Sequence, residues 1–498
     1  MKHITLLIIS AILITFFSCS ELEEEPYGFL TNENFYTTED NVYSGLLYAY
    51  EATKLGNFFN NFYSFTELGT GVTIMKSAET AANRQQMYNW TFNPSTEAIR
   101  AFYEAIYTGI FRTNTVLDNI DAIEFSNEEL KEQYRGEAMF IRAFYYFYLV
   151  RIFGEVPVYK TAGDPNVSYN TPVSSIEDVY SVIIGDLRFA AEHVPEFKIP
   201  GRADKTAAEA QLAKVYLQLA SSKEYDSPRY NWVGDYATMY DSAAFFASNV
   251  LNSSIFSLDT SVFNTFPDNE RNSKEKLFVW SVDLEGEEVG RTWLHTLFMP
   301  YTYYSLFYTD KPGTDEIVGY WGGWAVQWYN QEFYETHNPN DKRLELFMET
   351  QYDDINGANP ADQGEQNWCL KYASETTSFY QGAASWLFLR MSDIALIYAE
   401  ASGPSPEAYE TINTIRERAG IGALTPGLSR TEFIEAVWQE RLWELTMEGH
   451  LLFDLRRTHR VNEFIGRQVP YAYLHPLPQR EVDLNNAIEA DPEKETLY

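Results

Sequence analysis

Apolar residues recur at the spacing of an α-helix along much of the chain. The longest pattern covers residues 128–153, where Phe140, Ala143, Phe144 and Phe147 fall at i, i+3, i+4 and i+7. This segment is apolar on most faces, so we expect a helix buried between its neighbours. Further helices are predicted over residues 98–120, 236–251 and 408–419.

Three of the helical stretches share a small residue followed three positions later by tyrosine. A small residue lets paired helices approach closely, and the tyrosine fills the groove between them, as in tetratricopeptide repeats. The helical stretches together predict a mainly α-helical protein, and the repeat is typical of helix pairs, although three such pairs of residues can also occur by chance. The three pairs of residues are Ala143 with Tyr146, Ala213 with Tyr216, and Ala395 with Tyr398.

The helical pattern is interrupted twice. Residues 57–94 lack sustained periodicity and are rich in Asn, Ser and Gly, so they are predicted to form a long loop region. Between residues 257 and 385 the pattern fades again, apart from a candidate strand at 276–282. We expect an N-terminal helical region at 31–256, a loop-rich ligand-binding insertion at 257–385 and C-terminal helices at 386–498.

Residues 440–457 combine an amphipathic helical pattern with many charges, interrupted by Gly449. His450 and Asp454 lie four positions apart, which would suit a catalytic pair on one helix face. Carboxylates interleaved with arginines on a helix are more often structural ion pairs, however. We therefore interpret the stretch as a helix held by charge pairs and expect no catalytic residues.

The same stretch resembles a family signature. Glu440-Arg441, Glu444, Glu448-Gly449-His450 and residues 453–457 (FDLRR) match the pattern near the C-terminus of SusD/RagB-like proteins. Residues 135–157 (RGEAMFIRAFYYFYLVRIFGEVP), 201–220 and 476–485 (PLPQREVDLN) resemble the same family. The resemblance implies a SusD-like α/α superhelix of tetratricopeptide-type helix pairs.

Function also follows from this resemblance as an expectation. SusD-like proteins are surface lipoproteins that bind a nutrient glycan and deliver it to a SusC-like, TonB-dependent outer-membrane barrel. The expected partners are therefore that barrel and an oligo- or polysaccharide, with no cofactor and no enzymatic activity. Three alternatives stay open: a RagB-like protein that binds peptides, a secreted glycan-degrading enzyme, and a scaffold for other surface proteins.

The N-terminus predicts export. Residues 4–17 form an apolar segment too short to span a bilayer comfortably but suited to a signal peptide, and Cys19 follows it. We expect a lipoprotein signal at 1–18, lipidation of Cys19 and an acidic tether at 19–30. An ordinary secretory signal with an incidental cysteine is the alternative. The family resemblance implies a lipid-anchored, surface-exposed location on the outer membrane.

Charge and composition narrow the range of ligands. The chain has 37 Lys+Arg against 71 Asp+Glu, a formal charge of −34, which disfavours nucleic acid and favours a neutral or cationic ligand. With Cys19 assigned to the lipid anchor, Cys369 has no cysteine partner. Asp354-Ile355-Asn356-Gly357 imitates part of a calcium loop but lacks its first and last ligands, so no metal is expected.

Candidate ligand contacts come from the aromatic residues. Sugars have a flat apolar face and a hydroxyl rim, so they bind exposed rings flanked by hydrogen-bonding groups. The densest aromatic window, residues 301–329, includes Tyr308 and Trp328 and has Gly322-Gly323 at its centre. Core packing is an equally good explanation for any single ring. The predicted contacts are Trp321, beside flexible glycines, and Tyr303, Tyr304, Trp324 and Trp90.

Overall fold

The structure is a computed structural model. It describes residues 35–54, 56–76, 81–163, 170–266, 273–280, 294–301, 306–348, 353–354, 367–373, 382 and 385–497. The predicted signal peptide, Cys19 and the tether lie outside these residues, as do Tyr303, Tyr304 and most of the calcium-like loop. The chain divides into two compact units, Met1–Thr37 and Thr38–Tyr498, and every element from α3 onward belongs to the second. The boundaries expected at 256/257 and 385/386 both fall inside it.

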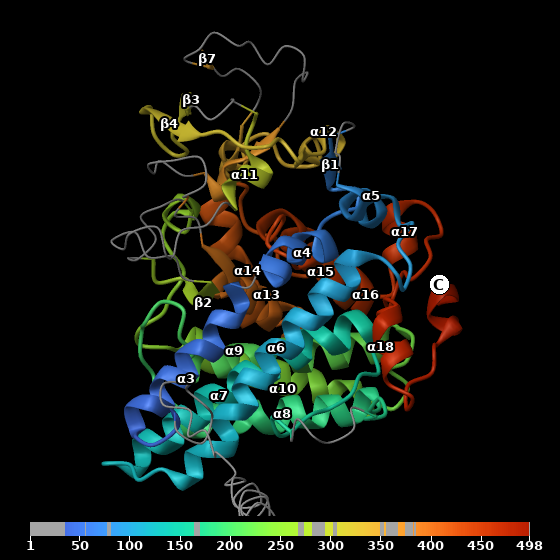
Figure 1. Ribbon diagram of the computed structural model, residues 1–498. Helices are drawn as coiled ribbons and strands as arrows, with labels where there is room; N and C mark the ends of the chain where they lie inside the picture. The colour runs from blue at the N-terminus through green and yellow to red at the C-terminus, as the bar shows by residue number, and fades with distance from the viewer. Residues whose placement is uncertain are drawn as a thin grey trace, which may run out of the picture. The chain divides into compact units, whose positions relative to one another are not determined.

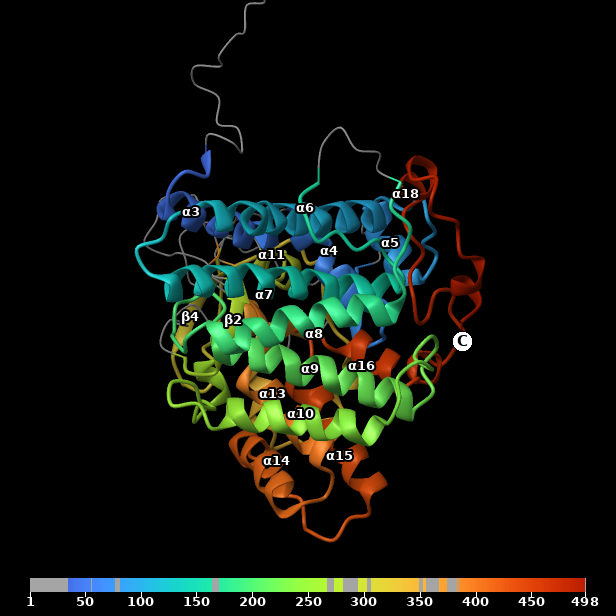
Figure 2. The same ribbon diagram turned by 90° about the horizontal axis from the view of Figure 1, so that it is seen from below.

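Helices stacked side by side form the main part of this unit. Figure 2 shows α6, α7, α8, α9 and α10 in successive layers, with α14 and α15 beyond them, and α13 packs against α9 and α10. The prediction of a mainly helical protein with repeat-like helix pairs is confirmed. The helices in this stack are α3 (Glu39–Glu51), α6 (Glu97–Asn119), α7 (Glu128–Phe153), α8 (Ile176–His193), α9 (Lys205–Glu224), α10 (Tyr236–Leu251), α13 (Met391–Ser402), α14 (Pro406–Ala419) and α15 (Arg430–Glu444).

Helix α7 lies in the core, as its sequence predicted. Its start is capped by Asn127, whose side chain accepts a hydrogen bond from the Glu129 N–H. From Ala138 onward nearly every side chain is buried, and Gly154, with a φ of 75°, ends the helix. None of the described helices is long and apolar enough to cross a membrane.

The prediction of a loop over residues 57–94 was wrong. This segment contains α4 (Gly56–Thr66), β1 (Thr73–Met75) and α5 (Ala82–Asn89). Phe58, Phe62 and Phe65 fall on one face of α4 and are each at most 2% exposed. Burial of that face against the core outweighs the weak helix propensity of the asparagines between the rings.

The region between α10 and α13 contributes short strands rather than a large sheet. Figure 1 shows β3 and β4 at the end of the unit where α11 lies, above α13 and α14. The predicted strand at 276 forms β2, which pairs antiparallel with β9. The elements are β2 (Lys276–Trp280), α11 (His295–Phe298), β3 (Leu306–Asp310), β4 (Ile317–Trp321), β5 (Gln327–Tyr329), α12 (Gln331–Tyr334), β6 (Phe347–Met348), β7 (Asp353–Asp354), β8 (Trp368–Cys369) and β9 (Trp386–Arg390).

These strands form small separate ladders. The three-stranded sheet has the order β4-β3-β7, while β1 pairs with β5 and β6 with β8. The chain then returns through α13–α15 to three short C-terminal helices. These are α16 (Leu451–Arg457), α17 (Val461–Ile465) and α18 (Gln479–Leu484).

Buried ion pairs join the loop-rich region to the C-terminal helices. Arg343 lies in the short 3-10 helix Lys342–Leu346 before β6, and its Nη1 donates to Glu440 at 2.6 Å and to Glu444 at 2.9 Å. Arg390 at the end of β9 donates to Glu444 at 2.8 Å and to Glu448 at 2.6 Å. The interpretation of residues 440–457 as a segment held by charge pairs is confirmed, with α15 ending before Gly449 and α16 beginning after it.

Glu444, at the centre of this cluster, is ionised inside the protein. Burial opposes ionisation of Glu444, but the guanidinium groups of Arg418, Arg390 and Arg343 outweigh it and hold its pKa well below the usual range. A buried ion pair contributes little more to stability than apolar side chains of the same size would. Removing one partner is nevertheless costly, because it leaves the other charge buried and unpaired. The cluster therefore fixes the position of the strand-containing region relative to the C-terminal helices.

Candidate functional site

The β3–β4 hairpin has one face in the core and one face toward solvent. Its register pairs Leu306 with Trp321, Tyr308 with Gly319, and Asp310 with Ile317. On the inner face, Phe307 and Tyr320 are both 0% exposed. Because side chains alternate along a strand, the residues of the opposite face lie together. This outer face carries Leu306, Tyr308 and Asp310 of β3 and Ile317, Gly319 and Trp321 of β4. We call its four apolar side chains, Leu306, Tyr308, Ile317 and Trp321, the hairpin platform.

The ring of the platform tyrosine packs against a glycine on the neighbouring strand. A Cβ added to Gly319 would be 3.0 Å from Cε1 and 3.4 Å from Cζ of Tyr308. The absence of a side chain at this position lets the ring cover the neighbouring strand, a packing that stabilises glycine in sheets. Tyr308 remains 42% exposed and Ile317 68% exposed, so the platform offers an apolar, partly aromatic surface to solvent.

Acidic residues surround the tip of the hairpin. Asp310, Asp315 and Glu316 are exposed at or next to the turn, where Lys311 is the one basic residue between the strands. The turn is held by hydrogen bonds from Lys311 N to Glu316 O at 2.8 Å and from Gly313 N to Glu345 Oε2 at 2.7 Å. The local charge is negative, so the platform attracts neutral or cationic groups more than anionic ones.

The glycines after Trp321 do not form a flexible hinge, which corrects the expectation from sequence. Gly322 and Gly323 are buried, and the Gly323 N–H donates to Pro300 O at 2.7 Å. A Cβ on Gly323 would lie 2.4 Å from Thr296 O, so only glycine fits this close approach of two backbones. Trp321 is therefore held by a rigid segment.

The remaining predicted contacts are distributed differently. Trp324 is half-buried in the loop after β4, where its carbonyl accepts a hydrogen bond from Lys76 Nζ at 2.9 Å. Trp90 is 3% exposed, with its indole N–H donating to Gly69 O at 2.9 Å. Its ring also packs against Phe92. The structure places Trp90 in the core rather than at the surface, so we leave it out of the platform.

The structure thus brings together one predicted residue, Trp321, with Tyr308, which was not among the predicted contacts. Figure 1 shows α5, which ends just before Trp90, on the opposite side of the unit from β3 and β4. Tyr308 lay within the aromatic window, and the alternation of Leu306, Tyr308 and Asp310 against buried Phe307 was the signal that could have identified it. Aromatic residues on both faces of the hairpin obscured that alternation.

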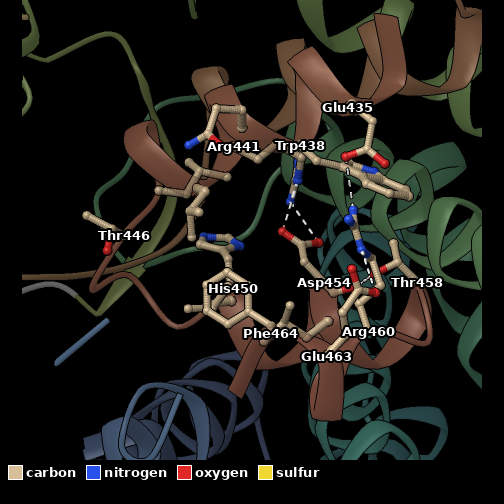
Figure 3. Close-up of a pocket in the computed structure, with 15 residues that line it drawn as sticks. Glu435, Trp438, Arg441, Thr446, His450, Asp454, Thr458, Arg460, Glu463 and Phe464 are labelled. Atoms are coloured by element: carbon tan, nitrogen blue, oxygen red, sulfur yellow. Dashed lines mark hydrogen bonds and ion pairs between the residues drawn. The ribbon is translucent and has the colours of Figure 1, made fainter. Parts of the chain in front are cut away.

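A second concave site lies between α15, α16 and α17. Figure 3 shows it, with Arg441, His450 and Asp454 on its inner side and Trp438 and Arg460 nearby. Asp454 accepts hydrogen bonds from Arg441 Nε at 3.0 Å and from Arg457 Nε at 2.8 Å. Burial opposes its ionisation, but these two arginines lower the pKa of Asp454 to about 2.

His450 is likewise held by structural partners. Its Nδ1 lies 2.9 Å from Lys214 Nζ and 3.6 Å from Asp393 Oδ2. Burial and the Lys214 ammonium hold the pKa of His450 well below its usual range, although Asp393 opposes them. Asp454 is occupied by two arginines, so the pair has the surroundings of a structural cluster rather than of a general acid and base. Among the described residues, no group of three or more His, Cys, Asp or Glu side chains is arranged to hold a metal ion.

The fold defines the class of protein to which the chain belongs: a helical-repeat protein with an insertion that contains short strands. Two family models then match the chain, one described as "Starch-binding associating with outer membrane" over residues 22–217 and one as the SusD family over residues 308–466. The chain belongs to the SusD/RagB-like family.

Individual relatives agree with this assignment. SusD-like protein P2 of Formosa agariphila is 26% identical over 95% of this chain and 96% of that protein. A SusD homolog from Bacteroides thetaiotaomicron has the same fold at a TM-score of 0.75 and 22% identity, covering 93% of this chain and 98% of that one. A laminarin-binding SusD-like protein matches at a TM-score of 0.75 and 20% identity, covering 92% and 99%.

Proposed function

We propose that this protein binds a neutral nutrient glycan at the cell surface, with the hairpin platform as its principal contact. The observation that carries the proposal is the position of Tyr308, which is 42% exposed, and Trp321, which is partly buried, on the same outer face of a hairpin whose other face is buried. Two rings on neighbouring strands can stack on successive sugars, at about 0.5–1.5 kcal/mol each. Family membership and the laminarin-binding relative support a glycan as the ligand.

The surroundings of the platform favour neutral sugars over sulfated or uronic acid polymers. Asp310, Asp315 and Glu316 are exposed beside it, and the whole chain has a formal charge of −34. An anionic glycan would meet repulsion that salt screens over roughly 8–10 Å. Neutral glucans and similar polymers carry no such cost, and hydroxyl groups at the rim can donate hydrogen bonds to these carboxylates.

The family also supports an assignment within a transport system. The protein captures the glycan and delivers it to a SusC-like, TonB-dependent outer-membrane barrel, and lipidated Cys19 anchors it to the outer membrane. Anchoring keeps the binding site at high effective concentration over the barrel, so weak affinity for the glycan suffices. Its role is binding rather than bond cleavage.

A calorimetric titration against neutral glycans, anionic glycans and peptides tests this proposal, with analysis of the mixture for cleavage products. We expect saturable binding to a neutral glycan without products. Binding restricted to peptides would replace glycan by peptide as the ligand, and release of shorter sugars would make the protein an enzyme. Purification of the tagged protein from its own outer membrane tests the partner, because a TonB-dependent barrel should accompany it.

A further inference from the structure

The cavity between α15, α16 and α17 has features of a binding site separate from the hairpin platform. Its volume is about 220 Å³. A cavity of about 150 Å³ already accommodates benzene in another protein, so this one has room for a single substituted ring. Its walls include Leu442, Leu445, Leu451 and Leu455, and Phe464 lines it while remaining 38% exposed. We call it the C-terminal cavity.

One polar side chain, His450, lines this largely apolar space and has a partner at only one of its two ring nitrogens. His450 is 6% exposed and lines the C-terminal cavity, and Figure 3 shows its imidazole on the side facing Asp454. Lys214 Nζ, which is paired with Asp393 at 2.8 Å, lies 2.9 Å from His450 Nδ1. An ammonium group can only donate, so Nδ1 accepts and the ring proton is on Nε2.

This N–H has no acceptor among the described residues, because the contacts of His450 with Lys214 and Asp393 both involve Nδ1. Nε2 is not one of the fully buried polar atoms that lack a partner, so water can reach it from the cavity. A ligand oxygen can take the place of that water. The other charged groups of the cavity are already engaged: Arg441 binds Asp393 and Asp454, while Arg460 binds Glu435 and lies 4.9 Å from the Trp438 ring.

We propose that the C-terminal cavity binds a small neutral molecule with one aromatic ring and one hydroxyl or carbonyl oxygen. The ring lies among the leucines, and the oxygen accepts the hydrogen bond from His450 Nε2. Asp454, Glu435 and Glu463 line the cavity together with two arginines, which leaves one negative charge in excess and disfavours an anionic ligand. This site is independent of glycan binding at the hairpin platform.

Titration of the full chain with p-cresol, followed by ligand-observed NMR and calorimetry, tests the proposal. We expect one saturable site with a Kd of about 1 mM or tighter, an ordinary value for a ligand of this size. The comparison ligand is p-xylene, in which a methyl group replaces the hydroxyl. Because p-xylene displaces water from this donor without offering an acceptor in its place, its binding should be at least fivefold weaker.

Variants locate the site. Leu442→Trp fills the cavity from the partly exposed face of α15 and should weaken p-cresol binding at least tenfold. Thr431→Trp, on an exposed part of the same helix outside the cavity, is the matched control and should change it less than twofold. Phe464→Ala removes a partly exposed ring at the cavity, perturbs the core less, and should weaken binding at least threefold.

Two results would overturn the proposal. The first is the lack of saturable p-cresol binding by the wild-type chain up to about 5 mM, a limit chosen several-fold above the expected Kd. The second is equal p-cresol binding by wild type, Leu442→Trp and Phe464→Ala. Equal affinity for p-cresol and p-xylene would remove the hydrogen bond to His450 from the proposal and leave an unspecific apolar cavity.

Discussion

Substitution of Glu444 by glutamine tests the conclusion that buried ion pairs hold the strand region on the helices. Glu444 accepts hydrogen bonds from Arg343 at 2.9 Å, Arg390 at 2.8 Å and Arg418 at 2.6 Å. Its side chain is fully buried, so water cannot solvate the arginines that lose their charged partner in the variant. Removing one partner from a buried cluster of this kind costs about 3–5 kcal/mol.

Glu435→Gln is the matched control, because it is the same change on the same helix. Glu435 pairs with Arg460 at 3.1 Å, but its side chain is 51% exposed. Exposed pairs contribute about 0–1 kcal/mol. Glu444→Gln should therefore lower the free energy of unfolding by at least about 2 kcal/mol more than Glu435→Gln does.

Urea unfolding followed by tryptophan fluorescence measures both variants under the same conditions. A shift of the midpoint without a change of slope would show that stability itself has changed. If Glu444→Gln and Glu435→Gln were equally mild, the cluster would not be holding the two regions together. The energetic argument would then be wrong even though the contacts are present.

Three further predictions concern other buried groups. Burial raises the pKa of Glu67 to about 8, although the Gly449 N–H that donates to it opposes the shift. Because the pKa of Glu67 is higher in the folded than in the unfolded chain, its contribution to the free energy of unfolding should fall as the pH rises. The fall should be up to about 1.4 kcal/mol per pH unit between about pH 4.5 and 8. The stability difference between Glu67→Gln and wild type should grow in favour of the variant over that window, and a pH-independent difference in urea unfolding would contradict the assignment. Gly323→Ala should lower stability by about 1–3 kcal/mol, because the new Cβ would lie 2.4 Å from Thr296 O; Gly322→Ala in the same turn is the comparison, and an unchanged midpoint for Gly323→Ala would refute the close packing. Burial raises the pKa of the Cys369 thiol to about 12, so iodoacetamide should label it only in denaturant, and mass-spectrometric detection of labelling in the folded protein at pH 8 would contradict its burial.

The sequence predicted the helical scaffold well because helical periodicity is a local property. Helix α7 is recognisable from the spacing of its phenylalanines alone. Helix α4 was missed because the apolar residues on its buried face, Phe58, Phe62 and Phe65, are separated by asparagines typical of loops. Tertiary packing decides such cases, and no local pattern contains that information.

The ion-pair cluster and the candidate site were only partly predictable for the same reason. The charges of residues 440–457 indicated structural pairing, but their partners Arg343 and Arg390 lie far away in sequence. Trp321 was identified from its aromatic surroundings, whereas the burial of Trp90 depends on its contact with Gly69. Which rings face solvent is decided by the register of β3 and β4, and that register becomes visible only in three dimensions.

The central claim is that the hairpin platform binds a neutral glycan. The most direct test compares the affinities of three variants for the glycan that the wild-type chain binds. Tyr308→Ala and Trp321→Ala each remove a platform ring, while Tyr236→Ala removes a ring of similar exposure, 41% against 42%, on α10. The account predicts that each platform substitution weakens binding about three- to tenfold, the equivalent of one stacked ring, and that Tyr236→Ala leaves it unchanged. Equal affinity in all three variants and wild type would contradict it and place glycan binding on another surface.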